Sequence, residues 1–145
     1  VWERWNSVMP DGHMSSTGMN SLNHYAYGAV MEWVCRDAAG LAPVEDAPGF
    51  RKALMHPHPD TRLGEIDFSY ESAMGRYRTH WKTVDETTFD WELEVPFGAQ
   101  AEAVLPLGTV TGSDADWQEQ ADGCLHAVLE SGRALFGKAA AGRAL

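Results

Sequence analysis

Hydrophobic and polar residues alternate with a period of two along most of the chain after residue 49. In three runs, large apolar or aromatic residues alternate with mostly polar ones, at residues 66–71, 77–82 and 89–95. Because successive side chains of a strand point to opposite faces, each run predicts a half-buried β-strand. Shorter runs predict further strands at residues 50–55, 100–105, 125–130 and 133–136. Short strands separated by turns in this way favour an antiparallel β-sandwich.

The residues before about position 45 follow a different pattern. Residues 1–19 contain Pro10 and a stretch rich in Ser and Thr, and they are predicted to form a long irregular loop. Apolar residues then recur at helical spacing, which predicts a helix over residues 21–39 with Gly40 as its C-terminal cap. Since few charges lie around this helix, we expect helices outside these 145 residues to bury it. Residues 43–49 are predicted to be a linker.

Composition and charge narrow the class of protein. Apolar residues make up 44% of the 145 residues, which is enough for a packed core. The net charge of −10 argues against nucleic-acid binding, because phosphate contacts need a basic surface. No apolar run reaches the length of about 20 residues that crosses a bilayer, so no membrane partner is expected. Two cysteines, Cys35 and Cys124, are too few for a disulfide framework.

The first residue is Val1 rather than methionine, and it opens directly on an aromatic and charged cluster. We therefore expect the chain to be a piece of a longer protein. The change of pattern divides it into residues 1–45 and residues 46–145. No cellular compartment is assigned on this basis.

Glu3 is the first candidate for chemistry, because it lies between Trp2 and Trp5. A carboxylate flanked by indole rings would be partly desolvated, which suits it to acid–base catalysis. The alternative is an ordinary surface glutamate beside two core tryptophans.

His24 is the second candidate, since it would lie in the first turn of the predicted helix, four residues before Gly28. The alternative is a core histidine satisfied by a hydrogen bond. The residues around both candidates are of the types that bind sugars. Aromatic faces stack on the C–H surfaces of pyranose rings, while Asn, His and Glu side chains bond to hydroxyl groups. The first third of the chain is therefore a candidate carbohydrate site.

Two other polar segments lack what a metal site needs. Residues 56–59, with the sequence His-Pro-His-Pro, offer two histidines but no third ligand, and they are predicted to be the exit from a strand. Asp114 and Asp116 have no calcium-loop glutamate at the right spacing. We expect neither a metal nor a cofactor.

The predicted order of strands and the segments around Glu3 and His24 together resemble the C-terminal end of a bacterial α-L-rhamnosidase of glycoside hydrolase family 78. The specific part of the resemblance is the sequence WERW at residues 2–5, followed by NSLNHYAYGAV at residues 20–30. Stretches that resemble the family's entry into its sandwich and its hairpins support it, at residues 48–52, 57–59, 70–76 and 95–106. Beyond about residue 106 the resemblance is weak.

This resemblance implies a fold and a reaction. Family members have an (α/α)6-barrel catalytic domain followed by a small sandwich, so the chain is expected to be mainly β, an antiparallel β-sandwich preceded by a loop and the last barrel helix. They hydrolyse terminal α-L-rhamnosyl linkages with inversion, so rhamnose-containing glycosides are the implied partners. Glu3 matches the family's general base and His24 a histidine that contacts bound rhamnose. The wall of the site, or the layer behind it, would comprise Trp2, Trp5, Asn23 and Tyr25.

The family's general acid lies on earlier barrel loops and has no counterpart in this sequence. We therefore expect the isolated 145 residues to be inactive and to self-associate or be locally disordered around the exposed helix. Two alternatives remain open: another inverting (α/α)6-barrel hydrolase acting on a different sugar, and a stand-alone carbohydrate-binding β-sandwich. The second would need an exposed aromatic platform, whereas Trp81 and Trp91 are in phase with core-facing positions.

Overall fold

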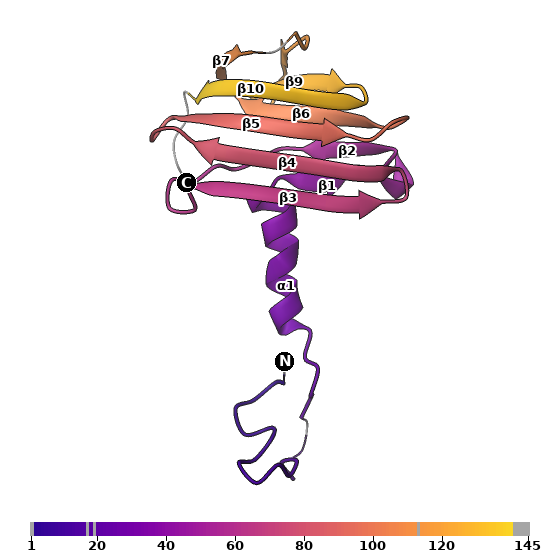
Figure 1. Ribbon diagram of the computed structural model, residues 1–145, viewed down its shortest axis with the longest axis vertical. Coiled ribbons are helices and arrows are strands. Elements are labelled where there is room, and N and C mark those ends of the chain that lie inside the picture. The colour runs from indigo at the N-terminus through magenta and orange to yellow at the C-terminus, as the bar shows by residue number, and fades with distance from the viewer. Residues whose placement is uncertain (1, 17, 19, 113, 141–145) are drawn as a thin grey trace. The chain divides into compact units, whose positions relative to one another are not determined.

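The structure, a computed structural model, describes residues 2–16, 18, 20–112 and 114–140 (Figure 1). The chain divides into two compact units, Val1–Trp33 and Val34–Leu145. Within the described ranges, no helix is both long enough and apolar enough to span a membrane.

The first unit is a loop followed by helix α1 (Ala26–Trp33). An isolated antiparallel bridge joins Val8 to Met14 in the loop. The helix starts later than predicted, because the carbonyl oxygen of Tyr25 accepts its first hydrogen bonds, from the amides of Gly28 at 2.7 Å and Ala29 at 3.1 Å. The prediction of a helix from residue 21 is therefore wrong at its N-terminal end.

The second unit begins with a π-helical segment, η1 (Val34–Ala38), which completes the span predicted as helix. Gly40 follows at φ +78°, as expected for a residue just after a helix. A side chain at this position would place its Cβ 2.3 Å from the backbone nitrogen of Pro57, so only glycine fits. The amide of His56 donates to the Gly40 carbonyl at 2.7 Å. The chain then enters strand β1 (Leu41–Pro43), which the sequence did not predict.

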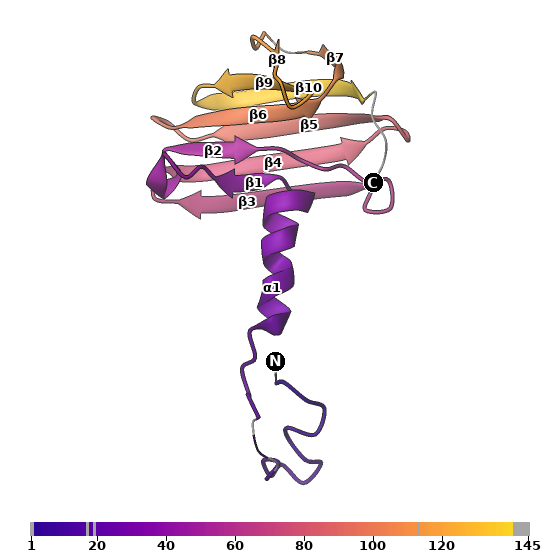
Figure 2. The ribbon, with the colours of Figure 1, turned by 180° about the vertical axis from the view of Figure 1, so that it is seen from behind.

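Two five-stranded sheets form the rest of the second unit (Figures 1 and 2). One sheet has the order β1-β2-β6-β9-β8, and the other β3-β4-β5-β10-β7. Pairing is antiparallel except between β2 and β6, which run parallel. The remaining elements are η2 (Pro48–Phe50), β2 (Lys52–Met55), β3 (Glu65–Ser72), β4 (Gly75–Thr83), β5 (Thr88–Val95), β6 (Gln100–Pro106), β7 (Gly108–Thr111), β8 (Gln118–Glu119), β9 (Cys124–Leu129) and β10 (Gly132–Ala140).

The predicted mainly β sandwich is confirmed, and so is the inward orientation of its tryptophans. Trp81 and Trp91 are both 0% exposed, on neighbouring strands at paired positions. Phe136 packs on Trp91 with ring centroids 5.6 Å apart. The predicted strands at residues 66–71, 77–82, 89–95 and 100–105 all lie within observed strands, whereas β7 and β8, like β1, were not predicted.

Buried polar groups in this core are satisfied by the segment that enters the sandwich. The indole nitrogen of Trp81 donates to the carbonyl oxygen of Ala38 at 2.7 Å. Thr79, which is 0% exposed, donates its hydroxyl to the carbonyl of Ala39 at 3.2 Å and accepts from the indole of Trp91 at 2.9 Å. Since unpaired buried polar groups are costly, these bonds fix residues 38–39 against the core.

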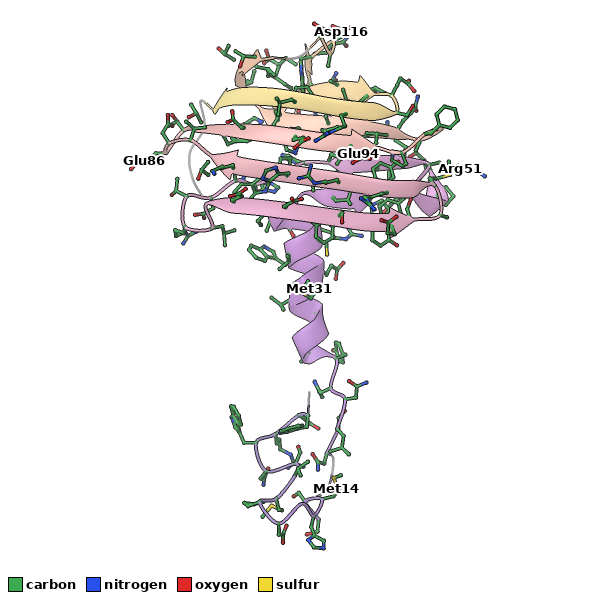
Figure 3. All side chains as sticks on the ribbon, in the orientation of Figure 1. Met14, Met31, Arg51, Glu86, Glu94 and Asp116 are labelled. Atoms are coloured by element: carbon green, nitrogen blue, oxygen red, sulfur yellow. The ribbon has the colours of Figure 1, made fainter. Side chains whose placement is uncertain are left out.

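The outer face of the β3–β7 sheet carries a ladder of paired charges. Arg78 contacts Asp67 at 2.7 Å and Glu92 at 3.1 Å, and Arg133 also reaches Glu92. His80 lies 2.7 Å from a carboxylate oxygen of Glu65. Glu94, labelled in Figure 3, belongs to β5 of the same sheet. Glu65, Asp67 and Glu92 therefore pair with basic side chains on neighbouring strands.

We expect Thr79→Val to lower the free energy of unfolding by about 1–3 kcal/mol, because the Trp91 indole and the Ala39 carbonyl would each lose a buried partner. Urea unfolding of the 145-residue chain measures this loss. Thr79→Ser, which retains the hydroxyl, is the matched control and should lose less. Equal losses for the two variants would contradict a role for the hydrogen bonds.

Candidate functional site

Glu3 is tied by two hydrogen bonds to the segment just before α1. Its backbone amide donates to the carbonyl of Ser21 at 2.8 Å. In return, the Ser21 amide donates to Oε2 of the Glu3 carboxylate at 2.9 Å. The structure thus holds one carboxylate oxygen in place and fixes Glu3 to Ser21, three residues before His24.

Ser7 organises the loop between these two segments. It is 0% exposed, and its amide donates to the carbonyl of Arg4 at 3.0 Å. Its hydroxyl donates to Oδ1 of Asn20 at 2.5 Å, and its carbonyl accepts from the amide of Ser15 at 3.0 Å. Asn20 therefore joins the two ends of the loop.

His24 precedes α1 rather than lying in its first turn. Its Nδ1 accepts a hydrogen bond from the amide of Ala26 at 3.2 Å, which satisfies one of the unpaired amides at the start of a helix. The imidazole stacks on Tyr25, with ring centroids 5.5 Å apart and planes inclined by 18°. His24 is therefore neither helical nor a core residue.

The predicted wall residues are open to solvent within these 145 residues. Trp5 is 97% exposed, Tyr25 81% and Trp2 44%, and Asn23 is exposed as well. The two indoles therefore do not belong to a core formed by the described residues.

A second polar cluster, which sequence reasoning missed, lies on the outer face of the β1–β8 sheet. Lys52 Nζ contacts Glu102 Oε2 at 2.8 Å, and Glu102 Oε1 lies 3.0 Å from Nδ1 of His126. The other ring nitrogen of His126 lies 2.9 Å from Asp122 Oδ2. These four residues form one continuous chain of charge-assisted contacts, called the His126 cluster below.

Two carboxylates control the protonation of His126. Burial alone would lower its pKa, but hydrogen bonds to Asp122 and Glu102 outweigh burial, and the net pKa is raised. The pKa values of Glu102 and Asp122 are lowered in turn, for Glu102 chiefly by its hydrogen bond to Lys52 and for Asp122 by the backbone amide of Cys124. The structure therefore favours a charged imidazolium between two carboxylates.

The pKa of His56 is shifted in the opposite direction to that of His126. Burial, together with the neighbouring His58 and His126, lowers its pKa to about 4. The His56 and His58 rings lie 4.5 Å apart, and His58 contacts the carbonyl of Asp37 at 3.1 Å. Among the described residues, no group of three or more His, Cys, Asp or Glu side chains is arranged to hold a metal ion.

The His126 cluster predicts a pH dependence of stability. A raised folded-state pKa means that the imidazolium contribution is complete below the ordinary histidine pKa of about 6.5 and is lost as pH rises through the raised value. The pKa values of the two carboxylates are lowered, so their pH dependence runs in the opposite direction. Their contribution to folding stability is present above about pH 5 and is lost on acidification. All contributions coexist between about pH 5 and 6.

We expect His126→Gln to lower the free energy of unfolding by about 1–2 kcal/mol near pH 5.5, and by less as pH rises above the folded-state pKa of His126. Urea unfolding across this range measures the difference. His13→Gln is the control, because His13 and the Asp11 carboxylate 3.3 Å away are both exposed. A loss for His126→Gln that stays constant with pH would contradict the ionic role.

Comparison with known proteins finds two family models that match successive parts of this chain. A family model described as the bacterial alpha-L-rhamnosidase 6 hairpin glycosidase domain matches residues 1–38. A second model, described as the bacterial alpha-L-rhamnosidase C-terminal domain, matches residues 40–118, more than half of the chain. The chain therefore belongs to the bacterial α-L-rhamnosidase C-terminal domain family, as the resemblance indicated.

Individual relatives agree with this assignment. An α-L-rhamnosidase from Alteromonas is 39% identical over 73% of this chain, and one from Streptomyces avermitilis is 34% identical over 91%. The crystal structure of the Streptomyces avermitilis enzyme complexed with L-rhamnose matches 94% of this chain with a TM-score of 0.75 and 32% identity, over 13% of its own length. This chain spans only 11% and 13% of the two relatives' sequences.

Proposed function

We propose that this chain is the C-terminal part of a larger glycosidase that hydrolyses terminal α-L-rhamnosyl linkages with inversion, and that it contributes the general base, Glu3, but not the general acid. The observation that carries the proposal is the match of residues 1–38 to a six-hairpin glycosidase domain, within which Glu3 is fixed to Ser21. The presence of L-rhamnose in a related crystal structure supports the choice of sugar.

The geometry around Glu3 fits the work of a base. An inverting hydrolase places its base about 6.5–9.5 Å from its acid, so that a water molecule fits between the base and the anomeric carbon. The Ser21 amide holds Oε2, and we assign Oε1 to the attacking water.

Neighbouring residues receive roles in the same proposal. His24 would contact the rhamnose, and its Nδ1 bond to the Ala26 amide fixes the tautomer with a proton on Nε2 when the ring is neutral. The exposed aromatic side chains would face the sugar or the rest of the barrel, with Trp2, Trp5 and Tyr25 nearest in sequence to Glu3 and His24.

We also propose that residues 1–45 form the end of the barrel domain and that residues 46–145 form the sandwich domain. Within the first part, β1 (Leu41–Pro43) already pairs with β2 of the sandwich. The functional division therefore concerns residues 1–38, the part that matches the glycosidase domain model.

A stand-alone carbohydrate-binding sandwich is less well supported. Its aromatic platform would have to come from the large sheet aromatics, yet Trp81 and Trp91 are buried in the core. A hydrolase for another sugar differs from our proposal only in the substrate, and a panel of aryl glycosides offered to the longer enzyme distinguishes the two by selectivity for rhamnoside, fucoside or glucoside.

In the longer enzyme, we expect Glu3→Gln to lower kcat by about 10²–10⁴-fold with little effect on KM, because the amide cannot take a proton from water but retains the hydrogen bond to Ser21. Steady-state hydrolysis of an aryl α-L-rhamnoside measures the change. Glu45→Gln, at an exposed position, is the control and should retain full activity.

Wild-type turnover by Glu3→Gln would remove Glu3 from the role of base. The isolated 145-residue chain provides a second check, because without the general acid it should release no rhamnose at a useful rate. Clear release of rhamnose by the purified chain would contradict the assignment of the acid to another part of the enzyme.

We further expect the isolated chain to self-associate through α1, where Val30 is 56% exposed and Trp33 52%. The double substitution Val30→Gln, Trp33→Gln should shift the chain toward monomer in sedimentation velocity. The matched control replaces Val84 and Leu135, which are 64% and 63% exposed on the sandwich, by Gln. A monomeric wild-type chain would contradict this expectation.

A further inference from the structure

The His126 cluster forms one wall of a hollow of about 760 Å³ beside β8 and β9. Gln118 and Gln120 line it from the β8 segment, and Val128 and Ala121 contribute apolar surface. Asp116, labelled in Figure 3, lies at its rim in the segment before β8. The volume falls within the range of about 300–1,000 Å³ that is typical of small-molecule sites.

The charges around the hollow argue against an ionic ligand. Lys52 and His126 are its cations, and both already contact carboxylates at 2.8–3.0 Å. With Asp116 added, the carboxylates outnumber the cations, so an anion would meet net negative charge. A cation would meet the ammonium of Lys52 beside Glu102, and no metal-holding group of three ligands occurs in the described parts of the chain.

A neutral ligand rich in hydroxyl groups matches this lining. Hydroxyls can donate to the carboxylates of Glu102 and Asp122 and accept from the amide groups of Gln118 and Gln120. Val128, which is 58% exposed, offers an apolar surface for C–H groups on the same ligand. Polar groups fixed by their own contacts are pre-organised, so binding costs little additional ordering.

The hollow lies only partly within the residues that the C-terminal domain model matches. The match ends at residue 118, whereas Gln120, Asp122, His126 and Val128 lie beyond it. The matched part contributes Lys52, Glu102, Asp116 and Gln118 to the lining.

We propose that the hollow binds a neutral sugar unit of a glycoside through the His126 cluster, Gln118, Gln120 and Val128. The choice of a sugar among neutral polyols rests on the proposed function. A sugar bound here would hold part of a larger glycoside to the sandwich surface.

Titration of the isotope-labelled 145-residue chain with L-rhamnose, followed by NMR, tests the proposal. We expect saturable shifts of the His126 ring signals at millimolar sugar. Val128→Trp, which fills the hollow, should raise the Kd at least tenfold. Val84→Trp is the matched control, because Val84 is 64% exposed on the β4–β5 turn, and it should leave the Kd unchanged.

A second variant, Gln118→Ala with Gln120→Ala, keeps the test valid if Val128→Trp does not fold, since both glutamines are exposed. It should also weaken binding. Absence of saturable shifts, or a Kd unaffected by either variant, would overturn the proposal. Turnover by the longer enzyme tests the Glu3 assignment, whereas binding to the 145-residue chain tests the hollow, so failure of the one and failure of the other give different results.

Discussion

The sandwich depends on how its two buried tryptophans satisfy their indole N–H groups. An indole gives a core a large apolar surface, but its nitrogen must have an acceptor when water is excluded. Trp81 finds this acceptor in the carbonyl of Ala38, and Trp91 in the hydroxyl of Thr79, which in turn bonds to the carbonyl of Ala39. The acceptors thus come from the chain segment that has just left η1. The same bonds satisfy the carbonyls at a helix end, which would otherwise lack partners.

That arrangement constrains the chain on both sides of residues 38–39. Both alanines are almost fully buried, which excludes larger side chains. The next residue, Gly40, must pass against the backbone of His56 and Pro57. From there the chain can only continue along the edge of β2, and it forms β1 in register with Ala53–Met55. A short strand therefore follows from the position of two indoles on the opposite sheet.

The sequence was informative where a side-chain pattern alone determines structure. Alternation around Trp81 and Trp91 predicted the central strands and their inner faces, because register is set by which face is buried. β1 was missed because its three residues have no alternation and end at a proline. β8 was missed because its two residues are polar and exposed, and only pairing with β9 defines them. The helix began late because His24 and Tyr25 supply its first hydrogen bonds from outside it, a contact that periodicity does not record.

The Glu3 and His24 region and the His126 cluster also differ in how far the sequence could predict them. Glu3 and His24 lie within one loop and the segment after it, so a local motif could indicate them, and the structure bonds Glu3 to Ser21, three residues before His24. The His126 cluster draws on β2, β6, β9 and the turn before β9, and its members are neighbours only because β6 pairs with both β2 and β9. A parallel pair within an otherwise antiparallel sandwich is what brings Lys52 beside Glu102. The polar contacts of the His126 cluster are complete within the sandwich. A general base, in contrast, has no catalytic use without its general acid. The proposed binding to the sandwich surface can therefore be tested in the 145-residue chain, while the proposed role of Glu3 as a base can be tested only in the longer enzyme.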